Sequence, residues 1–192
     1  MRVPTIKTYL TAASGVAAVE FAFILPVMLI LYFGLMDLTT LVVDNRKVTT
    51  VASAVADLTA QNRNTVLKSQ VTDYMRVSDL VLRPTPPNGV TVRVIGYRAS
   101  AGTPTLVWQT SNGAGPGCGA LPSTDGYLDL MTAGNDLVVA QACMTYAPYV
   151  ANFLGKSILG SDTFNVRQAV VVRPRAAPTL KCEVTAGGAA CS

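Results

Sequence analysis

Residues 16–36 read VAAVEFAFILPVMLILYFGLM, and this stretch decides how the rest of the chain can be arranged. As a helix it would span roughly 31 Å at about 1.5 Å per residue, which matches a hydrocarbon core about 30 Å thick. Glu20 is its single charged residue, and the run from Phe21 to Leu35 offers no polar face to water. The stretch therefore predicts a membrane-spanning helix rather than a buried core helix.

A cleaved secretory signal peptide is the rival interpretation, because Arg2 and Lys7 precede the apolar run. The run is longer than the usual apolar region of about 7 to 15 residues, and the small-residue sites at 52–56 lie well past its end. The basic N-terminus favours a cytoplasmic start, and four cysteines suit an oxidising compartment on the other side. We expect a single-pass anchor with an exported C-terminal region.

Composition excludes several chemistries. The chain has 15 basic and 11 acidic residues, so 14% is charged, against about a quarter in a typical soluble domain. It has no histidine, which excludes a Ser-His-Asp triad, an HExxH zinc helix and a C2H2 finger. The basic residues cluster only at Arg46-Lys47 and at 173–175, without interleaved aromatic residues, so no nucleic-acid binding is expected. We expect no enzymatic activity, no catalytic residues, no metal and no cofactor.

Glu20 is unusual where it stands. A charged side chain at the centre of a membrane helix costs about 2.5 to 3.5 kcal/mol on insertion scales, and such residues persist where they are paired or functional. The alternative is that Glu20 lies at the cytoplasmic interface, where water solvates it. Its setting favours a functional role, because Gly15 lies five residues before it and Phe21 follows directly.

The segment around Glu20 resembles the N-termini of type IV pilin-like proteins, in which a prepilin peptidase cuts after a glycine and leaves a glutamate at the fifth mature position. Here the match is Gly15/Val16-Ala17-Ala18-Val19-Glu20, followed by Phe21. The resemblance implies cleavage between Gly15 and Val16. The cut would create an α-ammonium on Val16, one helical turn from Glu20, and Glu20 of one subunit could then pair with the Val16 amine of its neighbour.

The longer stretch GVAAVEFAFILPVMLILYFGLMDL, residues 15–38, resembles the TadE-like family of minor pseudopilins from tight adherence (Tad) pilus systems. Its Glu-Phe pair, Pro26 and Gly-Leu-Met-Asp exit carry the resemblance. The resemblance implies a non-enzymatic structural protein of the bacterial inner membrane with a periplasmic C-terminal domain. It implies a role in pilus assembly and adhesion, in which the protein is incorporated into the pilus or primes it. Its implied partners are the membrane, the prepilin peptidase, other pilins or pseudopilins and the Tad assembly platform. The rival function is an uncleaved, membrane-anchored envelope domain with a ligand-binding or unrecognised enzymatic role.

Beyond the membrane segment, apolar spacing predicts continued helix. One stripe joins Leu41, Val48, Val51, Val55 and Leu58. A second, weaker helix is expected over 65–81, with a stripe of Leu67, Val71, Tyr74 and Met75. The segment 83–89 (RPTPPNG) ends helical structure, because three prolines in four residues cannot continue a helix.

Four β-like runs follow, at 90–97, 105–110, 136–146 and 164–173, and they predict one antiparallel sheet. The expected fold class is therefore α+β, with a long N-terminal pilin-like helix and a second helix packed on a small sheet. The expected organisation is a leader (1–15), a transmembrane helix (16–36), an extended helical region (37–83) and a disulfide-containing β domain (84–192). Neither the glycine-rich loop 112–119 nor Gly155-Lys156-Ser157 fits a phosphate-binding loop.

The chain has four cysteines and no CxxC spacing, so two disulfides are expected rather than a zinc site. Four cysteines allow three pairings. We favour Cys118 with Cys143, which would tie the glycine-rich loop to a strand, and Cys182 with Cys191, which would close the C-terminal tail. Free buried thiols are the alternative.

Overall fold

The structure is a computed structural model, and it describes residues 13–83, 89–100, 103–113, 117–122, 134–149 and 163–191. Four sequence-based expectations fall wholly or partly outside these residues: the leader 1–15 before residue 13, the turn 83–89 at 84–88, the glycine-rich loop at 114–116, and Gly155-Lys156-Ser157. The chain divides into two compact units, Met1–Thr40 with Ala147–Asp162, and Leu41–Tyr146 with Thr163–Ser192.

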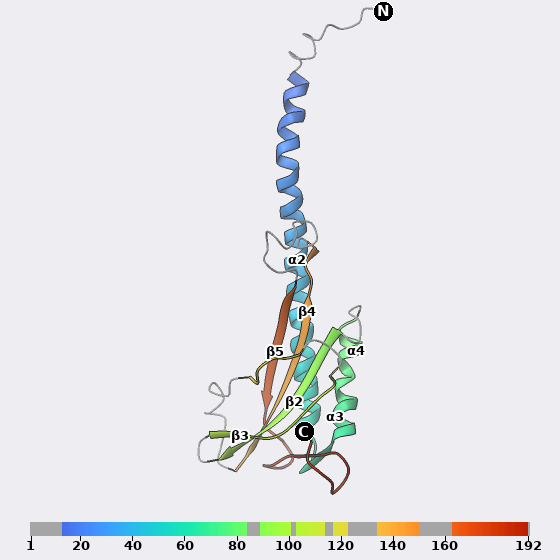
Figure 1. Cartoon of the computed structure of the whole chain (residues 1–192), viewed down its shortest axis with the longest axis vertical. Coiled ribbons are helices and arrows are strands. Elements are labelled where there is room, and N and C mark those ends of the chain that lie inside the picture. The colour runs from blue at the N-terminus through green and yellow to red at the C-terminus, as the bar shows by residue number, and fades with distance from the viewer. Residues whose placement is uncertain are drawn as a thin grey trace, which may run out of the picture. The chain divides into compact units, whose positions relative to one another are not determined.

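The described elements are one long helix, two short helices and six strands. In chain order they are α2 (Ala13–Ala60), β1 (Thr65–Leu67), α3 (Lys68–Met75), α4 (Val77–Val81), β2 (Val90–Ser100), β3 (Thr103–Ser111), β4 (Asp136–Tyr146), β5 (Phe164–Val172) and β6 (Lys181–Glu183) (Figure 1). This composition confirms the predicted α+β fold.

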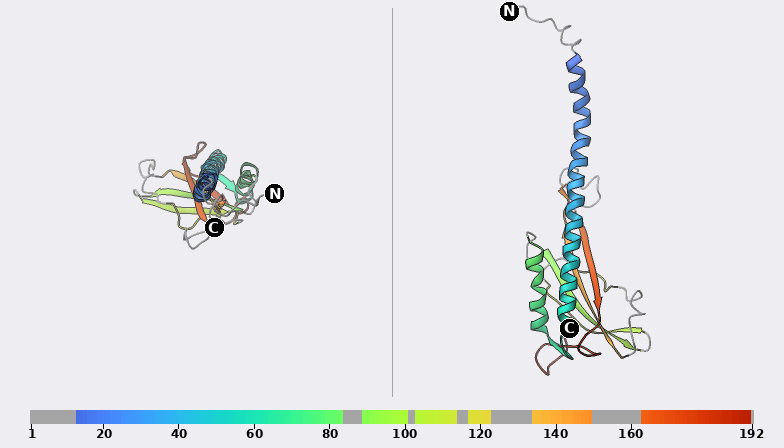
Figure 2. Two further views of the ribbon diagram at one scale, coloured as in Figure 1. Left: turned by 90° about the horizontal axis from the view of Figure 1, so that it is seen from above. Right: turned by 180° about the vertical axis from the view of Figure 1, so that it is seen from behind.

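The C-terminal part of α2 forms one wall of the core. Val48, Val51 and Val55 of the predicted stripe are fully buried, whereas Leu41 and Leu58 are only partly buried. Small residues complete the buried face, namely Ala52, Ala56 and Ala60. The small side chains allow the helix to lie close to its neighbours, and α3 and α4 lie beside it on the same side of the sheet (Figures 1 and 2).

The predicted sheet is present and fully antiparallel, with strand order β3-β2-β4-β5. β4 has the predicted bounds and is buried on both faces except at Thr145. Val92 and Val94 of β2 face the main core with α2, and Ile95 and Tyr97 belong to a second, smaller cluster with Val139 of β4. Side chains alternate between these two clusters because successive residues of a strand point to opposite faces.

The segment predicted as one helix over 65–81 is divided differently in the structure. Thr65–Leu67 forms β1, which pairs in parallel with β6, and the helical part is interrupted at Arg76 between α3 and α4. Val71 and Met75 are buried as the stripe predicted. The error at 65–67 has a physical cause, because the partner strand lies more than 110 residues later and leaves no mark on local periodicity.

The C-terminal segment is part of the core rather than a loose tail. Trp108 Nε1 donates a hydrogen bond to the Leu180 carbonyl (2.9 Å), and the buried Asp136 carboxylate accepts one from the Leu180 amide (2.7 Å). Arg98 donates to both oxygens of Asp136, at 2.7 and 2.9 Å. The Asp136 amide donates to the Pro178 carbonyl at 2.8 Å. These contacts fix the segment before β6 against the sheet.

Candidate functional site

The first candidate surface is the apolar part of α2, residues 16–36. None of its side chains is buried, and Phe21 and Phe23 are 63% and 77% exposed. Exposed apolar surface of this extent on one helix is expected where lipid or other helices, rather than water, surround it. Among the described residues, α2 from Val16 onward is the one helix long and apolar enough to cross a membrane.

The predicted processing residues all lie on this helix. Gly15, Val16, Glu20 and Phe21 fall in its first turns, since the helix begins at Ala13. Glu20 follows Val16 by four residues, which is about one turn, so both lie on the same side of the helix. Within the described residues Glu20 has no hydrogen bond or ion pair, and it is exposed together with its apolar neighbours.

Pro26 lies inside the helix without ending it. Proline has no N–H, so it cannot donate to the carbonyl of Ala22 four residues earlier. In water this would cost about 3 kcal/mol, whereas neighbouring helices in a membrane can satisfy the freed carbonyl. The position of Pro26 is thus compatible with helix packing in a bilayer.

Asp37 is a residue whose role the sequence reasoning missed. It directly follows the apolar stretch, is only 7% exposed, and accepts a hydrogen bond from the Tyr149 amide at 2.8 Å. Asp37 and Tyr149 belong to the same compact unit. Asp37 is therefore a folding contact as well as the first charge after the membrane segment. The only local sign of this contact was a carboxylate at the end of an apolar run, and that pattern does not predict Tyr149 as the partner of Asp37.

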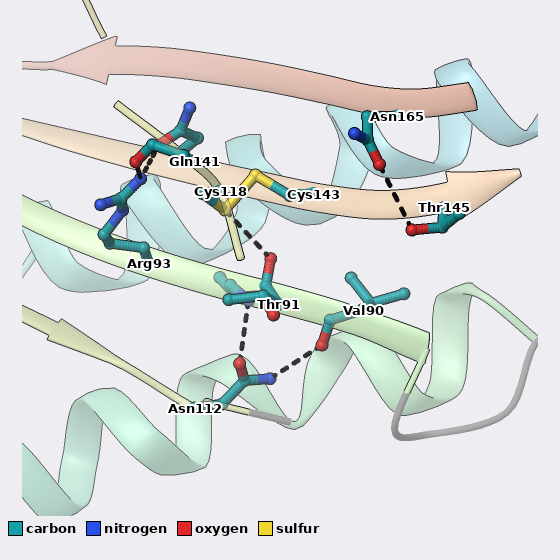
Figure 3. The surroundings of a disulfide bond; sticks show 11 residues. Val90, Thr91, Arg93, Asn112, Cys118, Gln141, Cys143, Thr145 and Asn165 are labelled. Atoms are coloured by element: carbon teal, nitrogen blue, oxygen red, sulfur yellow. Dashed lines mark hydrogen bonds between the residues drawn. A yellow bond between two sulfur atoms is a disulfide. The ribbon is translucent and has the colours of Figure 1, made fainter. Parts of the chain in front are cut away.

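The four cysteines pair two by two in the structure. Cys118 is joined to Cys143 of β4, and Cys182 of β6 to Cys191. The first bond attaches Cys118 to the face of the sheet opposite α2, where the Cys118 sulfur also lies 3.7 Å from the Thr91 carbonyl (Figure 3). The second closes the C-terminal loop. These are the pairings that the sequence favoured. Among the described residues, no three cysteine or acidic side chains gather as metal ligands.

These features define a protein with an N-terminal membrane helix and a disulfide-bonded α+β domain. Residues 15–57 match the family described as TadE-like protein, which covers the exposed helix and its continuation into the core. The predicted resemblance to the TadE-like family is thereby confirmed over this segment, and it fits a membrane protein associated with Tad pili. No curated protein and no solved structure matches the chain.

Proposed function

We propose that this chain is a minor pseudopilin of a Tad-type pilus, cleaved by a prepilin peptidase between Gly15 and Val16. It acts as a structural subunit of the bacterial inner membrane and the pilus assembly machinery, not as an enzyme. The C-terminal domain lies in the periplasm, because the basic N-terminal residues favour the cytoplasm and the disulfides require an oxidising compartment. Its partners are the peptidase, other pilins or pseudopilins and the Tad assembly platform.

The observation that carries the proposal is Glu20 on a helix of exposed apolar side chains that lies within the TadE-like match. After cleavage, the new Val16 ammonium and Glu20 lie one turn apart on each subunit. Glu20 of one subunit pairs with the Val16 ammonium of the next, which neutralises both charges inside an apolar bundle and sets the axial register. Breaking such a buried pair costs about 3 to 5 kcal/mol.

Processing is tested by Gly15→Val, because a peptidase that fits closely at the cut tolerates little side-chain bulk there. The variant is expected to accumulate as the full-length precursor, whereas the wild type loses residues 1–15 and keeps 177 of its 192 residues. Gly34→Val is the matched control, since a Cβ at Gly34 has nothing within 4 Å. Intact mass and N-terminal sequencing decide: an N-terminus at Val16 in Gly15→Val, or a full-length wild type, would refute the cleavage assignment.

Assembly is tested by Glu20→Ala with Glu20→Asp as the charge-retaining control. Glu20→Ala should insert into the membrane at least as well as the wild type, because it removes a charge from the apolar segment. Recovery in sheared pili should fall strongly for Glu20→Ala and partly return in Glu20→Asp. The melting temperature of the C-terminal domain should not change. Equal recovery of all three proteins in pili would discard the pairing model, whereas absence of the wild type from pili would favour the uncleaved envelope domain.

A further inference from the structure

Two arginines project from the second face of the sheet, the face opposite α2. Arg93 lies on β2 and Arg167 on β5, with β4 between them. In register, Arg93 is opposite Gln141 and Arg167 is opposite Cys143. Because Gln141 and Cys143 are two residues apart on β4, they lie on the same face and bring the two arginines into adjacent rows.

Both guanidinium groups meet at Gly119, in the segment that the Cys118 disulfide holds on the sheet. Arg93 Nη2 donates to the Gly119 carbonyl at 3.0 Å and to Gln141 Oε1 at 2.9 Å. A Cβ on Gly119 would lie 2.6 Å from Arg167 Nη2, and its φ of +64° also favours glycine. Figure 3 shows Arg93 and Gln141 beside the disulfide.

The charge of this pair is not balanced within the described chain. Arg98 and Arg175 each have a carboxylate partner, whereas no described carboxylate forms an ion pair with Arg93 or Arg167. Burial and the neighbouring positive charge of Arg167 lower the pKa of Arg93. The Arg93 Nε is buried and has no hydrogen-bond partner in the part of the chain that the structure describes. A bound anion would not reach this shielded Nε, but it would supply the counter-charge that the Arg93 guanidinium lacks among the described residues.

Arg93 lines a groove of about 340 Å³ next to Gly119. The other described walls are two hydroxyl-bearing residues, the disulfide and glycine main chain, contributed by Thr91, Ser111, Gly113, Gly117, Cys118 and Gly119. The volume is at the low end of small-molecule sites, and these walls offer no apolar side chain apart from the disulfide. A ligand that fits is therefore small, hydrophilic and anionic.

We propose that this groove binds a small carboxylate ligand of the acidic-sugar class, with Arg93 as the binding residue and Arg167 increasing affinity through its charge. Nη2 of Arg93 already donates to Gly119 and Gln141 and its Nε is shielded, so the carboxylate would be bound through Nη1 by a charge-assisted hydrogen bond. The exposed Ser111 at the groove wall suits a hydroxylated ring. The site is separate from the exposed apolar helix and does not rest on the pilus assignment. A free sugar acid and the end of an acidic polysaccharide present the same chemistry.

The test is calorimetric titration of the full chain, oxidised and in an uncharged detergent, with glucuronate. We expect saturable binding that weakens at high salt, with glucose at least about tenfold weaker because it lacks the carboxylate. A glucuronate oligosaccharide distinguishes the two sources: tighter binding than the monomer indicates a polymer end, and equal binding a free sugar acid.

Arginine variants distinguish binding in this groove from nonspecific attraction of glucuronate to the positive charge of the protein. Arg93→Gln should weaken glucuronate binding by at least about tenfold, and Arg167→Gln by several-fold with a smaller salt dependence. Arg167 makes no hydrogen bond among the described residues, so its variant keeps the test valid if Arg93→Gln does not fold. Arg46→Gln is the matched control, because it removes an exposed arginine from α2.

Four results would overturn the proposal. They are the absence of saturable glucuronate binding, equal affinity for glucose, an equal loss of affinity in Arg46→Gln and Arg167→Gln, and tighter binding of a short acidic peptide than of glucuronate. The last result would assign the groove to an acidic side chain of a protein partner.

Discussion

Gly96→Ala should destabilise the C-terminal domain because Trp108 lies directly over Gly96. The two residues are register partners on β2 and β3, and a methyl carbon on Gly96 would lie 2.3 Å from Trp108 Nε1 and 2.4 Å from Cε2. Carbon atoms pack at about 3.5 to 4.0 Å, so the indole ring would have to move by more than about 1 Å. The ring is 2% exposed and donates to the Leu180 carbonyl, so it cannot move without disturbing the core.

The magnitude follows from three contributions. Overpacking a core site costs about 1 to 3 kcal/mol, and losing the Trp108 hydrogen bond to Leu180 costs about 0.5 to 1.5 kcal/mol. Replacing a strand glycine by alanine returns about 0.5 to 1 kcal/mol of backbone entropy. The expected net loss is about 2 kcal/mol in the free energy of unfolding. For a domain of this size that corresponds to a fall in melting temperature of roughly 5 to 10 °C.

The assay is urea and thermal unfolding of the oxidised full chain in an uncharged detergent. Gly117→Ala is the matched control, because a Cβ at Gly117 has nothing within 4 Å, and its stability should match the wild type or exceed it slightly. In a Trp108→Leu background the same Gly96→Ala change should cost little, since the ring it meets is absent. An equal cost in both backgrounds, or equal stability of Gly96→Ala and Gly117→Ala, would refute the reasoning.

Asp136→Asn should lower the free energy of unfolding by about 2 to 4 kcal/mol in chemical denaturation, because it leaves Arg98 without its carboxylate partner and weakens the contact to the Leu180 amide. Replacing Cys118 and Cys143 by serine should cost roughly 3.5 kcal/mol, more than removing the C-terminal disulfide, whose loop is shorter; equal losses would contradict the loop-length argument. Burial raises the pKa of Tyr97, with a smaller opposing effect of a neighbouring arginine. Its contribution to stability is thus complete below about pH 10 and is lost as the pH rises through the raised pKa. Tyr97→Phe removes the titrating hydroxyl. Its free energy of unfolding should therefore fall less than that of the wild type when unfolding curves below and above that pH are compared.

Local sequence was sufficient to predict those helices and strands whose characteristic residue pattern lies entirely within their own residues. The apolar run 16–36 predicts its own helix, because a segment in lipid must satisfy its backbone internally. The bounds of β4 were predicted because its residues, Asp136–Tyr146, are mostly apolar and include the β-branched pair Val138-Val139. The stripe through Val48 and Val55 likewise identified the buried face of α2.

Local sequence was not sufficient where a contact joins distant segments. Thr65–Leu67 becomes a strand only because Lys181–Glu183 lies beside it. Gly119 is constrained only because two arginines from β2 and β5 meet there.

The sequence by itself thus determined the membrane helix, the α+β class and the motif around Glu20, since composition and periodicity act within one element. Only the tertiary structure decided which buried polar groups have partners. Asp136 and Arg93 are both charged residues on strands, yet Asp136 is paired with Arg98 and Arg93 has no carboxylate partner among the described residues. The difference arises because the partner of a side chain on a sheet is set by strand order and register, which bring together residues far apart in the chain.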